Sequence, residues 1–97
     1  MLVKLTEVCS NGALSTGQEY TLREVLVNPE HIVMIREDVR IRRLNEQGLL
    51  HDGLDAGHRF SKLTINRGNT GTEIVVVGAP AVVETSLVAN SKQLLRG

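Results

Sequence analysis

The sequence predicts a mostly β domain, a strongly bent five-stranded small barrel with a possible short C-terminal helix. Short apolar runs rich in β-branched residues alternate with segments rich in glycine and asparagine. These runs recur roughly every 8–14 residues, which is typical of small barrels and sandwiches. The chain has 97 residues and 2% aromatic residues, so we expect one domain (1–97) with a core of valine, isoleucine and leucine.

The first part of the chain is expected to form two strands joined by a loop. Residues 2–8 alternate between apolar and polar positions, as a half-buried strand does. Residues 9–19 are polar and contain the turn dipeptide Asn11-Gly12, which predicts a loop. Residues 20–27, rich in valine and leucine, predict the second strand.

A proline corner separates the second strand from the third. Asn28-Pro29-Glu30 ends the second run, because proline has no N–H for a ladder and keeps the preceding residue out of the helical region. Residues 31–36 (HIVMIR) predict the third strand. After Glu37-Asp38, residues 39–44 (VRIRRL) alternate and predict a fourth strand or a continuation of the third.

Glycine-rich segments separate the predicted elements of the second half. Residues 45–57 contain three glycines and predict an exposed hairpin loop ahead of a strand over residues 58–66. Residues 67–72 (RGNTGT) predict a tight turn. Residues 73–77 (EIVVV) are apolar at consecutive positions, which indicates a strand buried on both faces.

The last segment, residues 81–97, leaves two possibilities open. Val82 and Val83 extend the strand pairing, or the leucines that follow form a short helix ending before Gly97. Residues 86–97 are accordingly expected to be helical or frayed.

Charge and cysteine content restrict the function and the compartment. Eleven basic residues balance eleven acidic ones, so nucleic-acid binding would require a local patch instead of net charge. The single cysteine, Cys9, excludes an intrachain disulfide and a cysteine-based zinc site, and is consistent with a reducing compartment. With no signal-peptide pattern and no apolar run of about 18 residues, we expect a cytoplasmic protein.

No motif for catalysis is present in the sequence. The chain lacks the glycine-rich phosphate-binding fingerprints, and no serine or cysteine has the sequence context of an activated nucleophile. His51, Asp52, Asp55 and His58 either form a solvated loop or hold a metal ion. We expect no enzyme, no catalytic residues and no bound cofactor or metal.

Arginine is concentrated in the central half of the chain. Arg40 and Arg42 share one face of the predicted strand over residues 39–44, and Arg59 lies near them if the two strands pair. The planar guanidinium suits phosphate and base edges, so Arg40 and Arg42 are candidates for nucleic-acid binding. The alternative is a solvated outer face that discourages aggregation at a sheet edge.

An Arg67-Gly68-Asn69 turn follows one predicted strand and precedes the apolar strand over residues 73–77. Gly68 can adopt a positive φ, which exposes backbone amides and directs Arg67 outward; a plain hairpin turn would use glycine in the same way. The strand, the Arg-Gly-Asn turn and the apolar strand together resemble the second motif of the Sm-like proteins. The chain is also similar to a divergent, phage-associated group of that family from marine samples.

The resemblance implies a bent five-stranded barrel that assembles into a homo-oligomeric ring and binds RNA around the pore. Arg67, Gly68 and Asn69 would face the pore, with Asn28 and His31 nearby to contact the bases of single-stranded RNA or DNA. The resemblance favours five subunits, with six or seven as alternatives, and places a phage-encoded chain in the host cytoplasm.

The resemblance also implies that residues 20–43 supply the second and third strands and that residues 45–57 form the variable loop.

Two other function classes stay open. One is a structural or protein-interaction module of the phage type that binds no nucleic acid, which the zero net charge favours. The other is a small-molecule or metal-binding enzyme.

Overall fold

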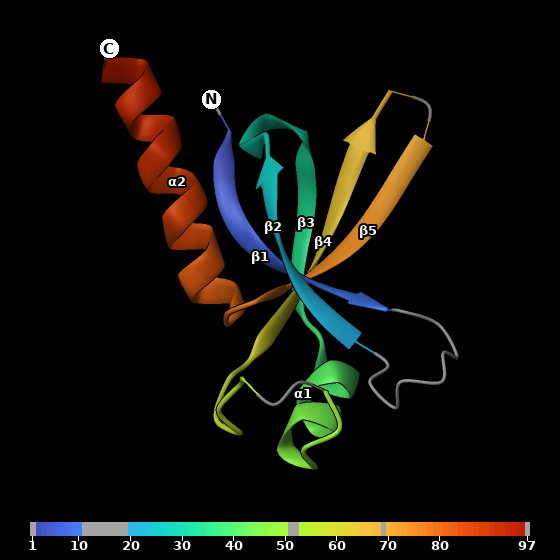
Figure 1. Cartoon of the computed structure of the whole chain (residues 1–97). Helices are drawn as coiled ribbons and strands as arrows, with labels where there is room; N and C mark the ends of the chain where they lie inside the picture. The colour runs from blue at the N-terminus through green and yellow to red at the C-terminus, as the bar shows by residue number, and fades with distance from the viewer. Residues whose placement is uncertain (1, 11–19, 51–52, 69, 97) are drawn as a thin grey trace.

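The described residues form eight elements in the computed structural model (Figure 1), which covers residues 2–10, 20–50, 53–68 and 70–96, with backbone alone for 67 and 90–96. The strands are β1 (Val3–Ser10), β2 (Tyr20–Val27), β3 (Ile32–Glu37), β4 (Phe60–Arg67) and β5 (Thr70–Val77). The helices are the 3-10 helix η1 (Pro29–His31), α1 (Val39–Glu46) and α2 (Pro80–Arg96). The prediction of a mostly β domain with five strands and a C-terminal helix is confirmed.

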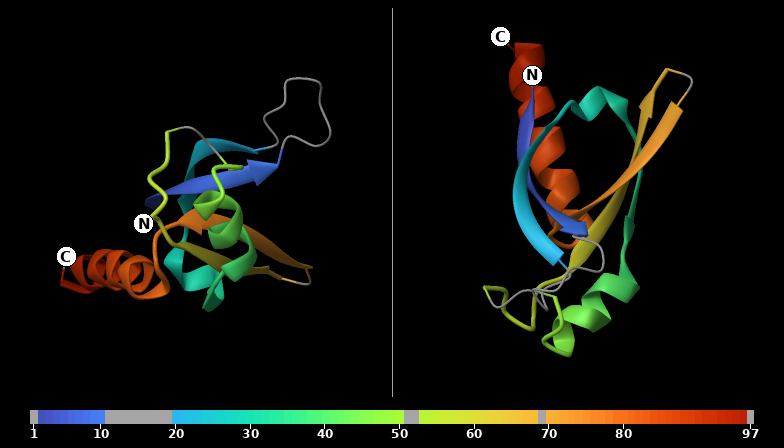
Figure 2. Two further views of the ribbon diagram at one scale, coloured as in Figure 1. Left: turned by 90° about the horizontal axis from the view of Figure 1, so that it is seen from below. Right: turned by 45° about the vertical axis from the view of Figure 1, so that its right-hand side comes forward.

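All five strands belong to one antiparallel sheet in the order β2-β1-β5-β4-β3, so β2 and β3 are its edge strands. The hairpins β1–β2 and β4–β5 are paired over their full length. They are joined to each other only where Glu7 and Val8 of β1 lie opposite Val76 and Val75 of β5. The hairpins cross at this point and diverge on either side of it (Figures 1 and 2).

Two cores lie on opposite faces of the strongly twisted sheet. The α2 core contains buried residues of four strands and of α2, namely Val3, Val27, Leu63, Val76, Val83 and Leu87. The α1 core contains Val8, Ile41, Leu50 and Phe60. Alternate residues of β5 divide between them, since Ile74 packs on the α2 core and Val75 and Val77 on the α1 core. The prediction that residues 73–77 form a strand buried on both faces is therefore confirmed.

Residues 39–46 form helix α1, so the prediction of a strand over residues 39–44 is wrong. The helix begins where Asp38 caps it: Asp38 Oδ1 accepts a hydrogen bond from the Ile41 N–H at 3.0 Å. Asp38 also donates its own N–H to Phe60 O at 2.9 Å, which ties the start of the helix to β4. The implied second and third strands do lie within residues 20–43, as β2 and β3, but residues 39–43 belong to α1 and not to a strand.

A glycine ends helix α1. Gly48 has a φ of 74° and donates its N–H to Asn45 O, while the Leu49 N–H donates to Leu44 O, which is the Schellman arrangement. Residues 45 and 46 therefore belong to α1, and the connection that follows joins this helix to β4 instead of forming a hairpin loop. Most of the described residues of this connection are exposed, as predicted, but two residues of the 45–57 segment are buried. Asn45 is 3% exposed and Leu50 is 1% exposed.

The connection between β4 and β5 is shorter than predicted. Arg67 lies opposite Thr70, so residues 70–72 belong to β5 and not to the turn. Gly68 has a φ of 74°, which confirms the expected positive φ. Asn69 lies outside the described residues.

Gly78 connects β5 to α2 with a φ of 127°, a conformation that residues with a Cβ rarely adopt. Its N–H donates to Arg59 O and its carbonyl accepts from the fully buried Ser61 hydroxyl, both at 2.7 Å. Helix α2 then begins at Pro80, so the extension of strand pairing by Val82-Val83 is ruled out and the C-terminal helix is confirmed. Within the described ranges, neither helix is long and apolar enough to cross a membrane.

Candidate binding site

The predicted site residues lie at two opposite ends of the molecule (Figure 1). Asn28 and His31 belong to the connection between β2 and β3, and Gly68 belongs to the β4–β5 turn at the same end. Arg40 and Arg42 lie on α1 at the other end, as the second view in Figure 2 also shows. The structure therefore brings together part of the predicted site and separates the helical arginines from it.

Asn28 and Pro29 build the corner between β2 and β3. Asn28 has an extended backbone (φ −90°, ψ 116°), as the following proline requires, and caps η1. Its Oδ1 accepts a hydrogen bond from the Glu30 N–H at 3.0 Å, and its carbonyl accepts from the His31 N–H at 3.0 Å. The Asn28 amide oxygen is thus used by the corner, while the His31 side chain is exposed at its end.

A groove of about 450 Å³ extends from this corner to the β4–β5 hairpin. We call it the hairpin groove; its lining is apolar except for Asn28, His31 and Thr72. The apolar lining comes from both hairpins and consists of Leu2, Val25, Leu26, Val27, Ile65 and Ile74. It is accessible because the hairpins diverge beyond their crossing point, which leaves Leu2 and Leu26 each 56% exposed.

Gly68 lies in the β4–β5 turn with free space around it. A Cβ placed on Gly68 would have no atom within 4 Å, and Gly68 is exposed. Arg67 is the last residue of β4, and its backbone position places it at the edge of the turn. The predicted Arg-Gly-Asn site is represented here by these two residues, because Asn69 is outside the described ranges.

Neither aromatic residue of the chain lines the hairpin groove. Phe60 is fully buried in the α1 core, and Tyr20 packs against the same core. His31 therefore supplies the one ring among the residues that line the groove.

At the opposite end, Glu37 holds two arginines. Arg59 donates from Nε and Nη2 to the two Glu37 carboxylate oxygens, both at 2.8 Å, and Arg42 Nη1 donates to Oε2 at 3.1 Å. The hydrogen bonds from Arg59 are the main reason that the pKa of Glu37 falls from 4.5 to about 2; Arg42 adds to the lowering, and partial loss of water opposes it. Arg42 also pairs with Glu46 at 3.4 Å.

This cluster corrects the predicted arginine face. Arg40 and Arg42 are two residues apart on a helix and so point in different directions, instead of sharing the face of a strand. Arg59 does lie near Arg42, but the shared Glu37 carboxylate brings them together and not strand pairing. Arg42 is paired with both Glu37 and Glu46, so its positive charge is compensated locally.

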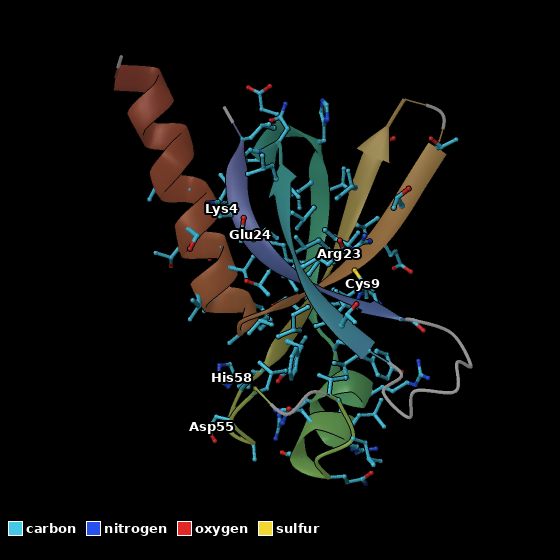
Figure 3. The ribbon with its side chains drawn as sticks, in the orientation of Figure 1. Lys4, Cys9, Arg23, Glu24, Asp55 and His58 are labelled. Carbon is cyan, nitrogen blue, oxygen red and sulfur yellow. The ribbon has the colours of Figure 1, made fainter. Side chains whose placement is uncertain are left out.

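Two of the residues considered for metal binding, Asp55 and His58, contact each other through the backbone of Asp55. His58 Nδ1 lies 3.1 Å from Asp55 O (Figure 3). His51 and Asp52 are outside the described residues. Within the part of the chain that the structure describes, no group of three or more His, Cys, Asp or Glu residues could hold a metal ion.

A second groove, of about 380 Å³, lies between the edge strand β3 and helix α2 and was not found from the sequence. Its apolar lining includes Val33 of β3, which is 60% exposed, and Val88 of α2, which is 44% exposed. Met34 beside Val33 is 43% exposed. The sequence shows an apolar run over residues 31–36, but only the strand order shows that this run lies at an edge.

Comparison of the chain with protein-family models, with curated proteins and with solved structures found no match.

Proposed function

We propose that this chain is a non-enzymatic, Sm-like binding protein that assembles into a ring and holds single-stranded nucleic acid, RNA in particular, at the hairpin groove. One observation carries the proposal. Asn28 and His31 on one side and the Arg67-Gly68 turn on the other lie at the same end of the molecule, with the groove extending between the corner and the hairpin.

The chemistry of the groove suits an unstacked base. A base has an apolar face that the valine and isoleucine side chains can cover, and polar edges that need a few donors. His31 offers a ring for stacking, and the Asn28 amide nitrogen offers a donor, since the amide oxygen is used by the Glu30 N–H. Arg67 at the turn offers a positive charge to the adjacent phosphate.

Assembly supports binding because one copy has few contacts of its own. The chain has zero formal charge, and two of its central arginines, Arg42 and Arg59, are paired with the carboxylates of Glu37 and Glu46. A ring repeats the same groove around an axis, so that one strand of nucleic acid binds several copies at once and the weak contacts reinforce each other. A ring of five copies in a reducing cytoplasm, which suits a chain with one free thiol, completes the proposal.

Fluorescence anisotropy with labelled oligouridine and oligothymidine tests the proposal. We expect binding that weakens with added salt, and loss of at least about tenfold in affinity for Arg67→Glu and for His31→Ala. The matched control is Arg43→Glu, an equal charge reversal on α1 at the far end. No salt-sensitive binding by the wild-type chain at low ionic strength would overturn the nucleic-acid part.

A second candidate function is a structural or protein-interaction module that binds no nucleic acid. The apolar lining of both grooves, together with Val33 and Val88 exposed beside the edge strand β3, favours it. Assembly in solution with no affinity for either oligonucleotide would select this second function.

A further inference from the structure

We propose that the groove between β3 and α2 binds an extended segment of a different protein, which adds as a strand to β3 and places a basic residue against Glu84. This inference goes beyond the proposed function and depends neither on the ring nor on nucleic acid. The groove shares no lining residue with the hairpin groove. The two sites can therefore be tested separately.

Strand β3 has backbone groups that such a segment can use. It is an edge strand, and in the described structure it pairs with β4 alone. Asp38, just after the strand, donates its N–H to Phe60 O, and the register is regular from there back to Met34. Because bonded and non-bonded pairs alternate in an antiparallel ladder, the N–H and C=O groups of Ile35 and Glu37 point away from β4. An incoming strand can pair with these groups.

Helix α2 forms the other wall of the groove and runs antiparallel to β3 (Figure 1). The helix begins shortly after Gly78, which is bonded to Arg59 O, and Arg59 is paired with Glu37 at the end of β3. Further along, α2 contacts η1, which precedes β3. A segment that pairs antiparallel with β3 therefore runs in the same direction as α2.

The spacing of side chains on α2 matches that of a strand. Glu84 and Val88 both line the groove and are separated by about 6 Å along the helix axis, at about 1.5 Å per residue. Alternate residues of a strand share a face and are about 6.6 Å apart. Two alternate side chains of the incoming strand can therefore face Glu84 first and Val88 second.

The charge of the groove determines the chemistry of the partner. Glu84 is the one charged residue among those that line the groove, it is exposed, and none of the ion pairs between described residues involves it. A basic side chain is complementary to it, whereas an acidic one is repelled. Val88 and Val33 beside it are exposed and gain from apolar cover. The favoured partner sequence is therefore a basic residue, any residue and an apolar residue, in that order.

Fluorescence anisotropy with labelled synthetic peptides tests this preference. The probe is TTTKTVTTT, and its controls are TTTETVTTT, with the charge reversed, and TTTVTKTTT, with the order reversed. We expect the probe to bind at least about tenfold more tightly than either control. In Glu84→Lys the preference should change to the glutamate peptide. Glu73→Lys, the same change at an exposed position of β5, should leave the preference unaltered.

Methylation of the peptide backbone tests the pairing with β3 and leaves the protein unchanged. In the proposed register the lysine of the probe lies opposite Ile35 and donates its N–H to Ile35 O, whereas the N–H of the next threonine points away from β3. A methyl group on the lysine nitrogen should weaken binding at least about tenfold, and one on the threonine nitrogen should have little effect. In NMR spectra of the labelled protein, the probe should shift the backbone amide signals of residues 32–37 and 84–88.

Each part of the inference has an outcome that overturns it. Equal binding of the lysine and glutamate peptides, or an unaltered preference in a folded Glu84→Lys variant, would exclude the role of Glu84. Equal effects of the two methyl groups would exclude strand addition. If none of the peptides binds, the whole inference is overturned, and the nucleic-acid proposal is unaffected because oligonucleotide binding is measured at the other groove.

Discussion

Replacing Gly78 with alanine tests how the sheet is connected to helix α2. Gly78 has a φ of 127°, and a Cβ built on it would lie 3.2 Å from Val83 Cγ2, a core atom of α2. The substitution therefore meets two obstacles at once. One is the backbone conformation, and the other is a side chain that is 2% exposed and has little room to move.

The magnitude follows from these two terms. A residue with a Cβ in a sparsely populated backbone region costs about 1–3 kcal/mol. Forcing a core side chain to move by a few tenths of an ångström adds about 1–3 kcal/mol. We expect Gly78→Ala to lower the free energy of unfolding by about 2–5 kcal/mol, a large part of the roughly 5–15 kcal/mol typical of a domain.

Two other glycines separate the terms. Gly48 has a φ of 74° with no atom within 4 Å of a built Cβ, so Gly48→Ala should show the backbone cost alone, about 1–2 kcal/mol. Gly71 has an ordinary φ and the same open space, so Gly71→Ala should cost little. Urea unfolding of the three variants measures the differences in their free energies of unfolding, provided that the dependence of this free energy on urea concentration is the same for all three.

Two results would refute this reasoning. If Gly78→Ala is no more destabilised than Gly48→Ala, the contact with Val83 has no energetic role. If Val83→Ala costs the same whether position 78 holds glycine or alanine, the contact is likewise excluded, because removing Cγ2 should relieve it.

Three further predictions concern the α1 end of the molecule. The pKa of Glu37 is lowered in the folded chain, so its contribution to stability is complete above pH 4.5 and is lost as the pH falls to about 2. The free energy of unfolding, measured as a function of pH, should fall over this range. In Glu37→Gln the fall should be smaller, because the titrating carboxylate is absent. Asn45→Ala leaves the Asp55 carbonyl without the 2.8 Å bond from Asn45 Nδ2, and should cost about 1–3 kcal/mol in urea unfolding and speed amide exchange in residues 53–58. Leu50→Ala should cost about 2–5 kcal/mol by thermal or urea unfolding, because Leu50 is 1% exposed in the α1 core.

Each of these has an outcome that contradicts it. If the free energy of unfolding of Glu37→Gln depends on pH in the same way as that of the wild-type chain, the Glu37 carboxylate does not cause the loss of stability in acid. If the backbone amides of residues 53–58 exchange no faster in Asn45→Ala than in the wild-type chain, the Asn45 side chain does not hold this segment in place. A loss below about 1 kcal/mol for Leu50→Ala would place that side chain outside the core.

Features set by local chemistry were predictable from the sequence. The extended conformation of Asn28 follows from Pro29, and the positive φ of Gly68 follows from its place in a two-residue turn. The apolar run over residues 73–77 correctly indicated a strand between two cores, because a strand exposed on one face would alternate.

Helix α1 was missed because its sequence fits two periods. In VRIRRL, Val39 and Ile41 are spaced as in a strand, whereas Ile41 and Leu44 are spaced as on one face of a helix. The deciding signals lie outside the run. Asp38 is a good N-cap and Gly48 a good C-terminal stop, and together they delimit a helix of two turns.

The candidate site was predictable only in part. The structure places Asn28 and His31 at the same end as Gly68, whereas Arg40 and Arg42 lie on α1 at the other end. The hairpin groove depends on how far two hairpins diverge, and the free edge of β3 depends on strand order. Both are set by contacts between residues far apart in the chain, which local patterns do not encode.

The narrow junction between the two hairpins has a consequence for folding. Each hairpin pairs neighbouring segments, whereas Glu7 and Val8 must find Val76 and Val75 across most of the chain. Closing so long a loop is slow, so we expect the hairpins to form before they meet. Before the hairpins meet, the backbone groups of β1 and β5 that face each other in the complete sheet are unpaired, in addition to the free edges of β2 and β3. We therefore expect the chain to be most prone to pairing with strands of other molecules at this stage.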